Sequence, residues 1–188
     1  RNARQPTALM IPGGNNPDEV MQVADKYWSI KNQMGVDTNI PLIAQIESTE
    51  GIDNMQEIRD STGIKDFGFG TNDLTVSVTG QERSVTEPFE FHPNVISNLQ
   101  KAHENAGEGR KLICGGLTTS MEGVAVLIGL GFTEISARPE STPALRDMIG
   151  TISQKDAKEW VKDIIQMGAE GKDHNDVKNY LEGKLKQE

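Results

Sequence analysis

Two carboxylates and one thiol stand where predicted strands end, and their types are suited to metal-assisted acid–base chemistry. Glu47 ends a strand predicted over residues 41–47, and Asn72-Asp73 ends one predicted over 63–73. Cys114, the single cysteine, ends a strand predicted over 111–114. Carboxylates are hard oxygen ligands of the kind that Mg²⁺ or Mn²⁺ prefers, and a thiol can act as a nucleophile or a proton donor.

Each of these residues also has a purely structural interpretation. Asn72 and Asp73 both suit a turn or a helix cap. Glu47 suits the start of a helix, where a carboxylate is favoured, and a free cysteine such as Cys114 is most often a small buried hydrophobe. None of these residues is specific alone, so the interpretation depends on whether the fold brings them together.

Strand and helix patterns alternate along the chain. Strands are predicted over 7–12, 41–47, 63–73, 111–114 and 133–136, and helices follow them from about residues 16, 49, 92, 118 and 143. The segment 74–91 has little periodicity and is expected to be a loop. A capping box at Ser153 predicts an amphipathic helix, and a last helix around Val177–Leu181 is expected to dock loosely.

Five such β/α repeats predict a parallel sheet with right-handed crossovers. An open doubly wound sheet and a closed (β/α) barrel both fit this pattern. In either fold the carboxyl ends of the strands lie at one edge, so Glu47, Asp73 and Cys114 are expected to converge there.

Composition excludes several classes of function. The net charge of −9 argues against nucleic acid or an anionic membrane as the main partner. The longest apolar run, over about residues 123–132, is well short of the ~20 residues of a membrane span. One cysteine excludes an intrachain disulfide, and with no signal-peptide pattern we expect a cytoplasmic protein. Because the chain opens with Arg1, we expect a piece or a processed form of a longer protein.

The segment Gly70-Thr71-Asn72-Asp73-Leu74-Thr75 resembles the signature of the phosphoenolpyruvate-utilising phosphotransferases. These include enzyme I of the sugar phosphotransferase system, pyruvate phosphate dikinase and phosphoenolpyruvate synthase. His92–Val95, Ile113–Gly115 and Gly129–Ser136 resemble further segments of that family in the same order. The resemblance implies a (β/α)₈ barrel, of which residues 1–152 carry strands four to eight, with 153–188 as a helical extension of the same domain.

By this resemblance the protein is a phosphotransferase. It would move the phosphoryl group of phosphoenolpyruvate to a histidine on a separate domain, releasing pyruvate. Glu47 and Asp73 would hold Mg²⁺, Asn72 and Arg83 would bind the substrate, and Cys114 would protonate the enolate carbon. Without the resemblance, Arg83 would be taken for a solvated loop residue. The missing strands leave two sheet edges, which predicts self-association.

Two departures from that family's pattern leave other functions open. Gly116 stands where the family commonly has Glu, and Val76 where it commonly has Gln. One alternative is a Mg²⁺-dependent lyase or aldolase that acts through pyruvate enolate, since such enzymes also place Glu and Asp at successive strand ends. The other is a non-catalytic dimerisation or regulatory domain.

Overall fold

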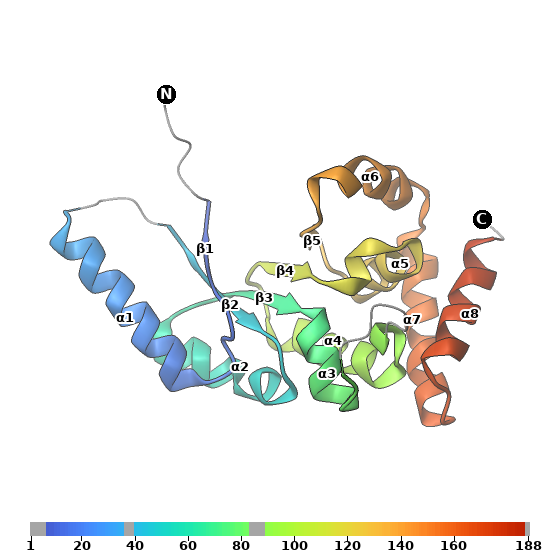
Figure 1. The fold of residues 1–188 in the computed structure, drawn as a ribbon, viewed down its shortest axis with the longest axis horizontal. Coiled ribbons are helices and arrows are strands. Elements are labelled where there is room, and N and C mark those ends of the chain that lie inside the picture. The colour runs from blue at the N-terminus through green and yellow to red at the C-terminus, as the bar shows by residue number, and fades with distance from the viewer. Residues whose placement is uncertain (1–6, 36–39, 83–88, 187–188) are drawn as a thin grey trace.

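The computed structural model describes residues 7–35, 40–82 and 89–186. Five strands form one sheet in which every neighbouring pair is parallel (Figure 1). In chain order and in sheet order they are β1 (Leu9–Ile11), β2 (Leu42–Ile46), β3 (Asp66–Gly70), β4 (Lys111–Cys114) and β5 (Glu134–Ile135). The parallel sheet predicted from the alternating pattern is thereby confirmed.

Helices follow each strand and then extend past the last one. They are α1 (Pro17–Gln33), α2 (Thr49–Thr62), α3 (Thr71–Thr79), α4 (Pro93–Asn105), α5 (Met121–Leu130), α6 (Thr142–Thr151), α7 (Gln154–Ala169) and α8 (His174–Leu185). Short 3₁₀ turns lie at η1 (Phe89–Phe91), η2 (Gly116–Thr119) and η3 (Pro139–Ser141). Most helices begin at the expected signals, as with Asn16 capping α1 ahead of Pro17.

The strand order decides between the two folds that the sequence left open. A doubly wound sheet reverses its strand order once, which puts helices on both faces. Here the order runs from β1 to β5 without a reversal, so right-handed crossovers place the connecting helices on one face. The helices that connect neighbouring strands accordingly pack on one another, α1 on α2, α2 on α4 and α4 on α5 (Figure 1). The molecule is therefore an α/β fold of the partial-barrel type.

The alternation of Phe and Gly in β3 separates the two faces of the sheet. Phe67 and Phe69 are fully buried in the core between the sheet and the helices. Gly68 and Gly70 face the other side, where an added Cβ on Gly68 would meet the Met10 side chain at 2.9 Å. The glycines therefore leave room on the inner face of the barrel, where the side chains of neighbouring strands lie.

Two expectations about helices are wrong. β3 stops at Gly70, and Asn72 and Asp73 lie in the first turn of α3, which covers part of the expected loop. The last helix, α8, is not loosely docked, because Val177 and Leu181 are fully buried and Asp173 forms a capping box at its start.

The sheet has two edges, β1 and β5. On β1, Leu9 and Met10 remain 37% and 36% exposed, which is unusual for large apolar side chains. The self-association expected from such edges stays a prediction. Within the described ranges, no helix is both long and apolar enough to cross a membrane.

Candidate active site

Glu47, directly after β2, is held in place by the loop that follows β1. The Gly13 N–H donates to Glu47 Oε2 at 3.2 Å, and the Glu47 N–H donates to Asn15 Oδ1 at 2.9 Å. Gly14 in turn donates its N–H to the Gln45 carbonyl at 2.7 Å. The loop after β1 therefore holds the carboxylate through one backbone N–H and the Glu47 backbone through the Asn15 side chain, contacts that sequence reasoning could not supply.

Gln45 is a residue of the site that the sequence analysis missed. Its amide nitrogen donates to Glu47 Oε1 and lies 4.0 Å from the Cys114 sulfur. Gly70 makes room for this contact, because an added Cβ there would lie 2.7 Å from Glu47 Oε1 and 3.1 Å from Gln45 Nε2. The signal was available: Gln45 is the one polar residue in an apolar strand, and a period of two puts it on the same face as Glu47.

Cys114 ends β4 and is half-buried. Its thiol is within 3.6 Å of the Phe69 carbonyl oxygen, to which it donates. Burial raises the pKa of the Cys114 thiol, and the negative charges of Glu47 and Asp73 raise that pKa further. The thiol therefore stays protonated at neutral pH, which suits a proton donor better than a thiolate nucleophile.

The three predicted residues come from neighbouring strand ends. The Gln45 amide nitrogen contacts both Glu47 and the Cys114 sulfur, and Asp73 follows β3, whose last residue, Gly70, is paired with Cys114. Glu47 comes from the loop after β2 and Asp73 from the first turn of α3, where its side chain is exposed to solvent. Glu47, Asp73 and Cys114 thus lie at one edge of the sheet, as expected from parallel strands.

Asn72 links the start of α3 to the turn after β4. Its side-chain oxygen accepts a hydrogen bond from the Gly116 N–H at 2.8 Å. Gly115, between Cys114 and Gly116, has φ +114°, and a Cβ there would lie 2.3 Å from Thr71 Oγ1. This backbone conformation and close approach both require glycine, so the Gly-Gly pair allows the turn to pack on α3.

The absence of a side chain at Gly116 also has a structural reason. A Cβ on Gly116 would lie 2.1 Å from the Glu90 carboxylate, which already fills that space. The second oxygen, Glu90 Oε2, is buried and has no hydrogen-bond partner among the described residues. Gly116 therefore fits the neighbouring η1 segment, and its small size alone does not indicate a lost activity.

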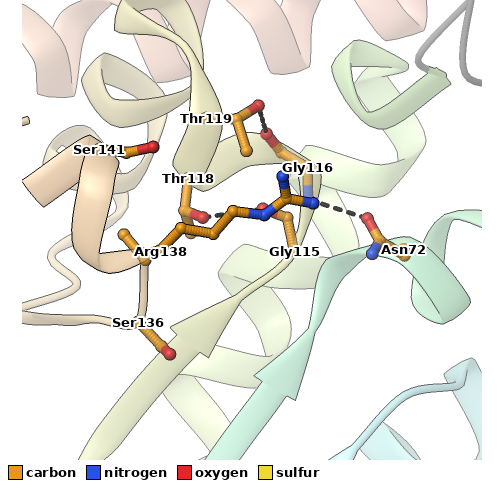
Figure 2. A pocket seen from close by; sticks show the side chains of 9 residues that line it. Asn72, Gly115, Gly116, Thr118, Thr119, Ser136, Arg138 and Ser141 are labelled. Atoms are coloured by element: carbon orange, nitrogen blue, oxygen red, sulfur yellow. Dashed lines mark hydrogen bonds between the residues drawn. The ribbon is translucent and has the colours of Figure 1, made fainter.

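A cavity of about 480 Å³ opens beside this turn (Figure 2). It is lined by Asn72, Gly115, Gly116, Thr118, Thr119, Ser136, Ala137, Arg138 and Ser141. Its volume is in the range of sites that hold small molecules. Figure 2 shows the Arg138 side chain extending from the loop after β5 toward the Gly115-Gly116 turn. Arg83, the arginine expected to bind the substrate, lies outside the described residues, and Arg138 was not among the expected site residues.

The donor set fits a hard divalent cation with few protein ligands. No group of three or more His, Cys, Asp or Glu side chains suited to a metal occurs within residues 7–35, 40–82 and 89–186. Two carboxylates from neighbouring strand ends are nevertheless the usual protein contribution to a Mg²⁺ site, whose other positions go to water or substrate. Glu47 and Asp73 are the residues that would hold such an ion.

Comparison with known proteins decides the family. The model of the HpcH/HpaI aldolase/citrate lyase family matches residues 3–107, more than half of the chain. The chain belongs to this family. The fold agrees, because a crystal structure of a citrate lyase from Burkholderia xenovorans superposes with a TM-score of 0.62 at 14% sequence identity. That match covers 98% of this chain and 64% of the citrate lyase chain.

A shorter match points to a different kind of protein. A multiphosphoryl transfer protein of Xanthomonas campestris pv. campestris is 33% identical over 86 residues, covering 43% of this chain and 10% of that protein. The chain thus spans less than two thirds of either relative. A match over so small a part of a protein does not carry that protein's activity to this chain.

The assignment to the phosphoenolpyruvate-utilising phosphotransferases is therefore wrong. The predictions that the protein is a transferase, a kinase or part of a phosphotransferase system are wrong as well, because the HpcH/HpaI family is one of aldolases and lyases. The error has a physical reason. Carboxylates after successive strands, here Glu47 and Asp73, are suited to a hard cation whichever reaction follows, so these residue types fit more than one kind of enzyme.

Proposed function

We propose that this protein is a Mg²⁺-dependent lyase or aldolase that breaks or forms a carbon–carbon bond through the enolate of pyruvate. The observation that carries the proposal is the placement of two carboxylates and a thiol at neighbouring strand ends, where Gln45 contacts both Glu47 and Cys114, and Asp73 follows the paired strand β3. Membership of the aldolase/citrate lyase family supports it.

In the cleavage direction the substrate is a 4-hydroxy-2-oxo acid. The bond between C3 and C4 breaks and its electron pair becomes the enolate, while the C4 hydroxyl loses its proton to solvent and becomes an aldehyde. A Mg²⁺ ion held by Glu47 and Asp73 would supply positive charge beside the enolate oxygen. The enolate carbon must then take up one proton to give pyruvate, so the reaction consumes no other reactant.

Cys114 is the residue we assign to that proton. Its raised pKa keeps the thiol protonated, and its position at the end of β4 places it beside both carboxylates. Gln45 orients the pair, because its amide nitrogen contacts both Glu47 and the Cys114 sulfur. The direction of bond formation is the reverse of this step, in which the Cys114 sulfur takes the same proton back from pyruvate.

Deuterium exchange into the methyl group of pyruvate tests this function without any aldehyde. Proton NMR of pyruvate in D₂O should show loss of the methyl signal that requires both the protein and Mg²⁺. Asp73→Asn should abolish the exchange and the Mg²⁺-dependent binding of oxalate, an enolate mimic, while circular dichroism stays unchanged because Asp73 is exposed.

Asp147→Asn is the matched control, since it removes one exposed carboxylate on α6, away from the strand ends. It should exchange pyruvate as the unchanged protein does. A folded protein that shows neither exchange nor Mg²⁺-dependent oxalate binding would contradict the proposed function.

A further inference from the structure

The cavity beside the Gly115-Gly116 turn differs in charge from the rest of the molecule. The chain has a net charge of −9, yet none of the described residues that line this cavity is an Asp or a Glu. One guanidinium, that of Arg138, faces it together with hydroxyl-bearing side chains, which are Thr118, Thr119, Ser136 and Ser141. The Thr118 and Thr119 hydroxyls donate to the Gly115 and Gly116 carbonyls, so among the described lining residues the guanidinium of Arg138 supplies the positive charge and most of the side-chain donors.

Arg138 has no carboxylate partner among the described residues. The ion pairs found there join Lys101 to Asp53, Arg110 to Glu134 and Lys162 to Glu159. An arginine that faces a cavity with no ion-pair partner is suited to a carboxylate or a phosphate, because its planar fork can donate two parallel hydrogen bonds.

The backbone at Arg138 is held by the turn that follows it. Ser141 donates its N–H to the Arg138 carbonyl at 3.0 Å, and the Thr142 hydroxyl donates to the same oxygen at 3.2 Å. Pro139 follows directly and restricts the chain at the start of η3. The guanidinium thus extends from an anchored position toward the Gly115-Gly116 turn (Figure 2).

The cavity adjoins the carboxylate and thiol centre through residues that the two regions share. Asn72 lines the cavity and directly precedes Asp73. Gly115 and Gly116 line it and directly follow Cys114. A substrate whose reacting carbon lies at the Cys114 thiol can therefore extend its other end into this cavity.

We propose that Arg138 selects the aldehyde half of the substrate by binding an anionic group, a carboxylate or a phosphate, at its far end. This proposal rests on the proposed function, because it names the acceptor of the same reaction. The cavity's volume of about 480 Å³ accommodates a fragment of several carbon atoms as well as the anionic group.

Matched aldehydes test the proposal with the Mg²⁺-loaded protein and pyruvate. One pair is 5-oxopentanoate and pentanal, which differ by a carboxylate; the other is glyceraldehyde 3-phosphate and glyceraldehyde, which differ by a phosphate. We expect the protein to prefer the charged member of at least one pair. Arg138→Gln should lower kcat/KM for that aldehyde by about 10- to 100-fold and leave the neutral one nearly unchanged.

Arg146→Gln is the control for net charge, because Arg146 lies on α6 and does not line this cavity. It should keep the preference, and Arg138→Lys should restore part of it. The pair that shows the preference identifies the carboxylate or the phosphate as the bound group.

Pyruvate deuterium exchange separates the two proposals, since it needs no aldehyde and should be unchanged in Arg138→Gln. Exchange without any preference for charged aldehydes, or a preference that survives Arg138→Gln, would overturn the role of Arg138. A loss of exchange in Arg138→Gln would likewise overturn it, by showing that the arginine acts at the pyruvate centre. Absence of exchange in the unchanged protein would instead contradict the proposed function, and the role of Arg138 with it.

Discussion

Two neighbouring regions at the carboxyl ends of the strands are built from opposite kinds of side chain. The first lies at the ends of β2 to β4, and the second lies at the ends of β4 and β5. The first brings Glu47 and Asp73 to one thiol, and its contacts are tight enough that Gly70 has no room for a Cβ. The second surrounds a cavity with hydroxyls, backbone and the guanidinium of Arg138.

This difference separates two tasks of the lyase that we propose. Negative side chains packed around a protonated thiol are suited to holding a cation and moving a proton. A cavity whose described lining includes an arginine and no carboxylate is suited to choosing a substrate by its charge. Changes in the first region should therefore affect every substrate, whereas changes in the second should affect substrates according to their charge.

The largest effect is expected from Gly70→Ala, which would break the first region. The new Cβ would lie 2.7 Å from Glu47 Oε1 and 3.0 Å from Glu47 Cγ, so the carboxylate must move. We expect Mg²⁺-dependent oxalate binding to be lost by calorimetry, with a loss of about 1–3 kcal/mol in the free energy of unfolding.

Gly150→Ala is the matched control for this substitution. Gly150 lies in α6 and nothing is within 4 Å of its added Cβ, so alanine there should leave oxalate binding intact. Its higher helix propensity should stabilise the protein by up to about 1 kcal/mol. Normal oxalate binding in Gly70→Ala would show that Glu47 is not needed in its present position.

An effect of intermediate size is expected on the ionisation of the Cys114 thiol. It would test whether the carboxylates of the first region act on this thiol. Because burial and two carboxylates raise the pKa of this thiol, less thiolate is present at a given pH than in the unfolded chain. Alkylation by iodoacetamide, followed by mass spectrometry, should therefore need a higher pH in the folded protein than in urea.

Asp73→Asn should shift that alkylation profile back toward lower pH, since it removes one of the charges that raise the pKa of Cys114. Arg138→Gln removes a cation from the neighbouring region and is not expected to have this effect. A profile that matches that of the unfolded chain would mean that the two carboxylates do not act on the thiol.

The smallest effect is expected at the opposite end of the strands, where Glu134 pairs with Arg110. Nitrogen-to-oxygen distances are 3.0 and 2.5 Å, and hydrogen bonding to Arg110 lowers the pKa of the Glu134 carboxyl. Both side chains are more than a third exposed to solvent. Glu134→Gln should therefore lower the free energy of unfolding by less than about 1 kcal/mol.

The sign of this effect with pH follows from the lowered pKa. The ion pair contributes stability above the pKa of Glu134 in the unfolded chain, and that contribution is lost as pH falls through the pKa in the folded protein. Urea denaturation should therefore show a difference between Glu134→Gln and the unchanged protein at neutral pH that vanishes in acid. Oxalate binding should not change, and a change would link this end of the strands to the site.

Several elements could be predicted from the sequence because their signals are local. Asn16-Pro17 starts α1, Ser153 caps α7, and the strand predicted over 111–114 is β4 as the structure has it. The helix α3 was missed because its residues, rich in Thr, Val and Ser, have low helix propensity. Packing against α4 and β3 stabilises it instead.

Residue types alone determined that Glu47, Asp73 and Cys114 could support metal-assisted proton transfer, and the β/α alternation determined that strand ends would meet at one edge. They did not decide the family, because enolate chemistry places the same types at the same strand ends in different enzymes. Only the tertiary structure brought Gln45 between Glu47 and Cys114 and turned Arg138 toward the Gly115-Gly116 turn. The physical reason is the distance along the chain over which each interaction acts. Caps and periodicity act over a few residues, whereas these contacts depend on strand register and on the paths of loops far apart in the chain.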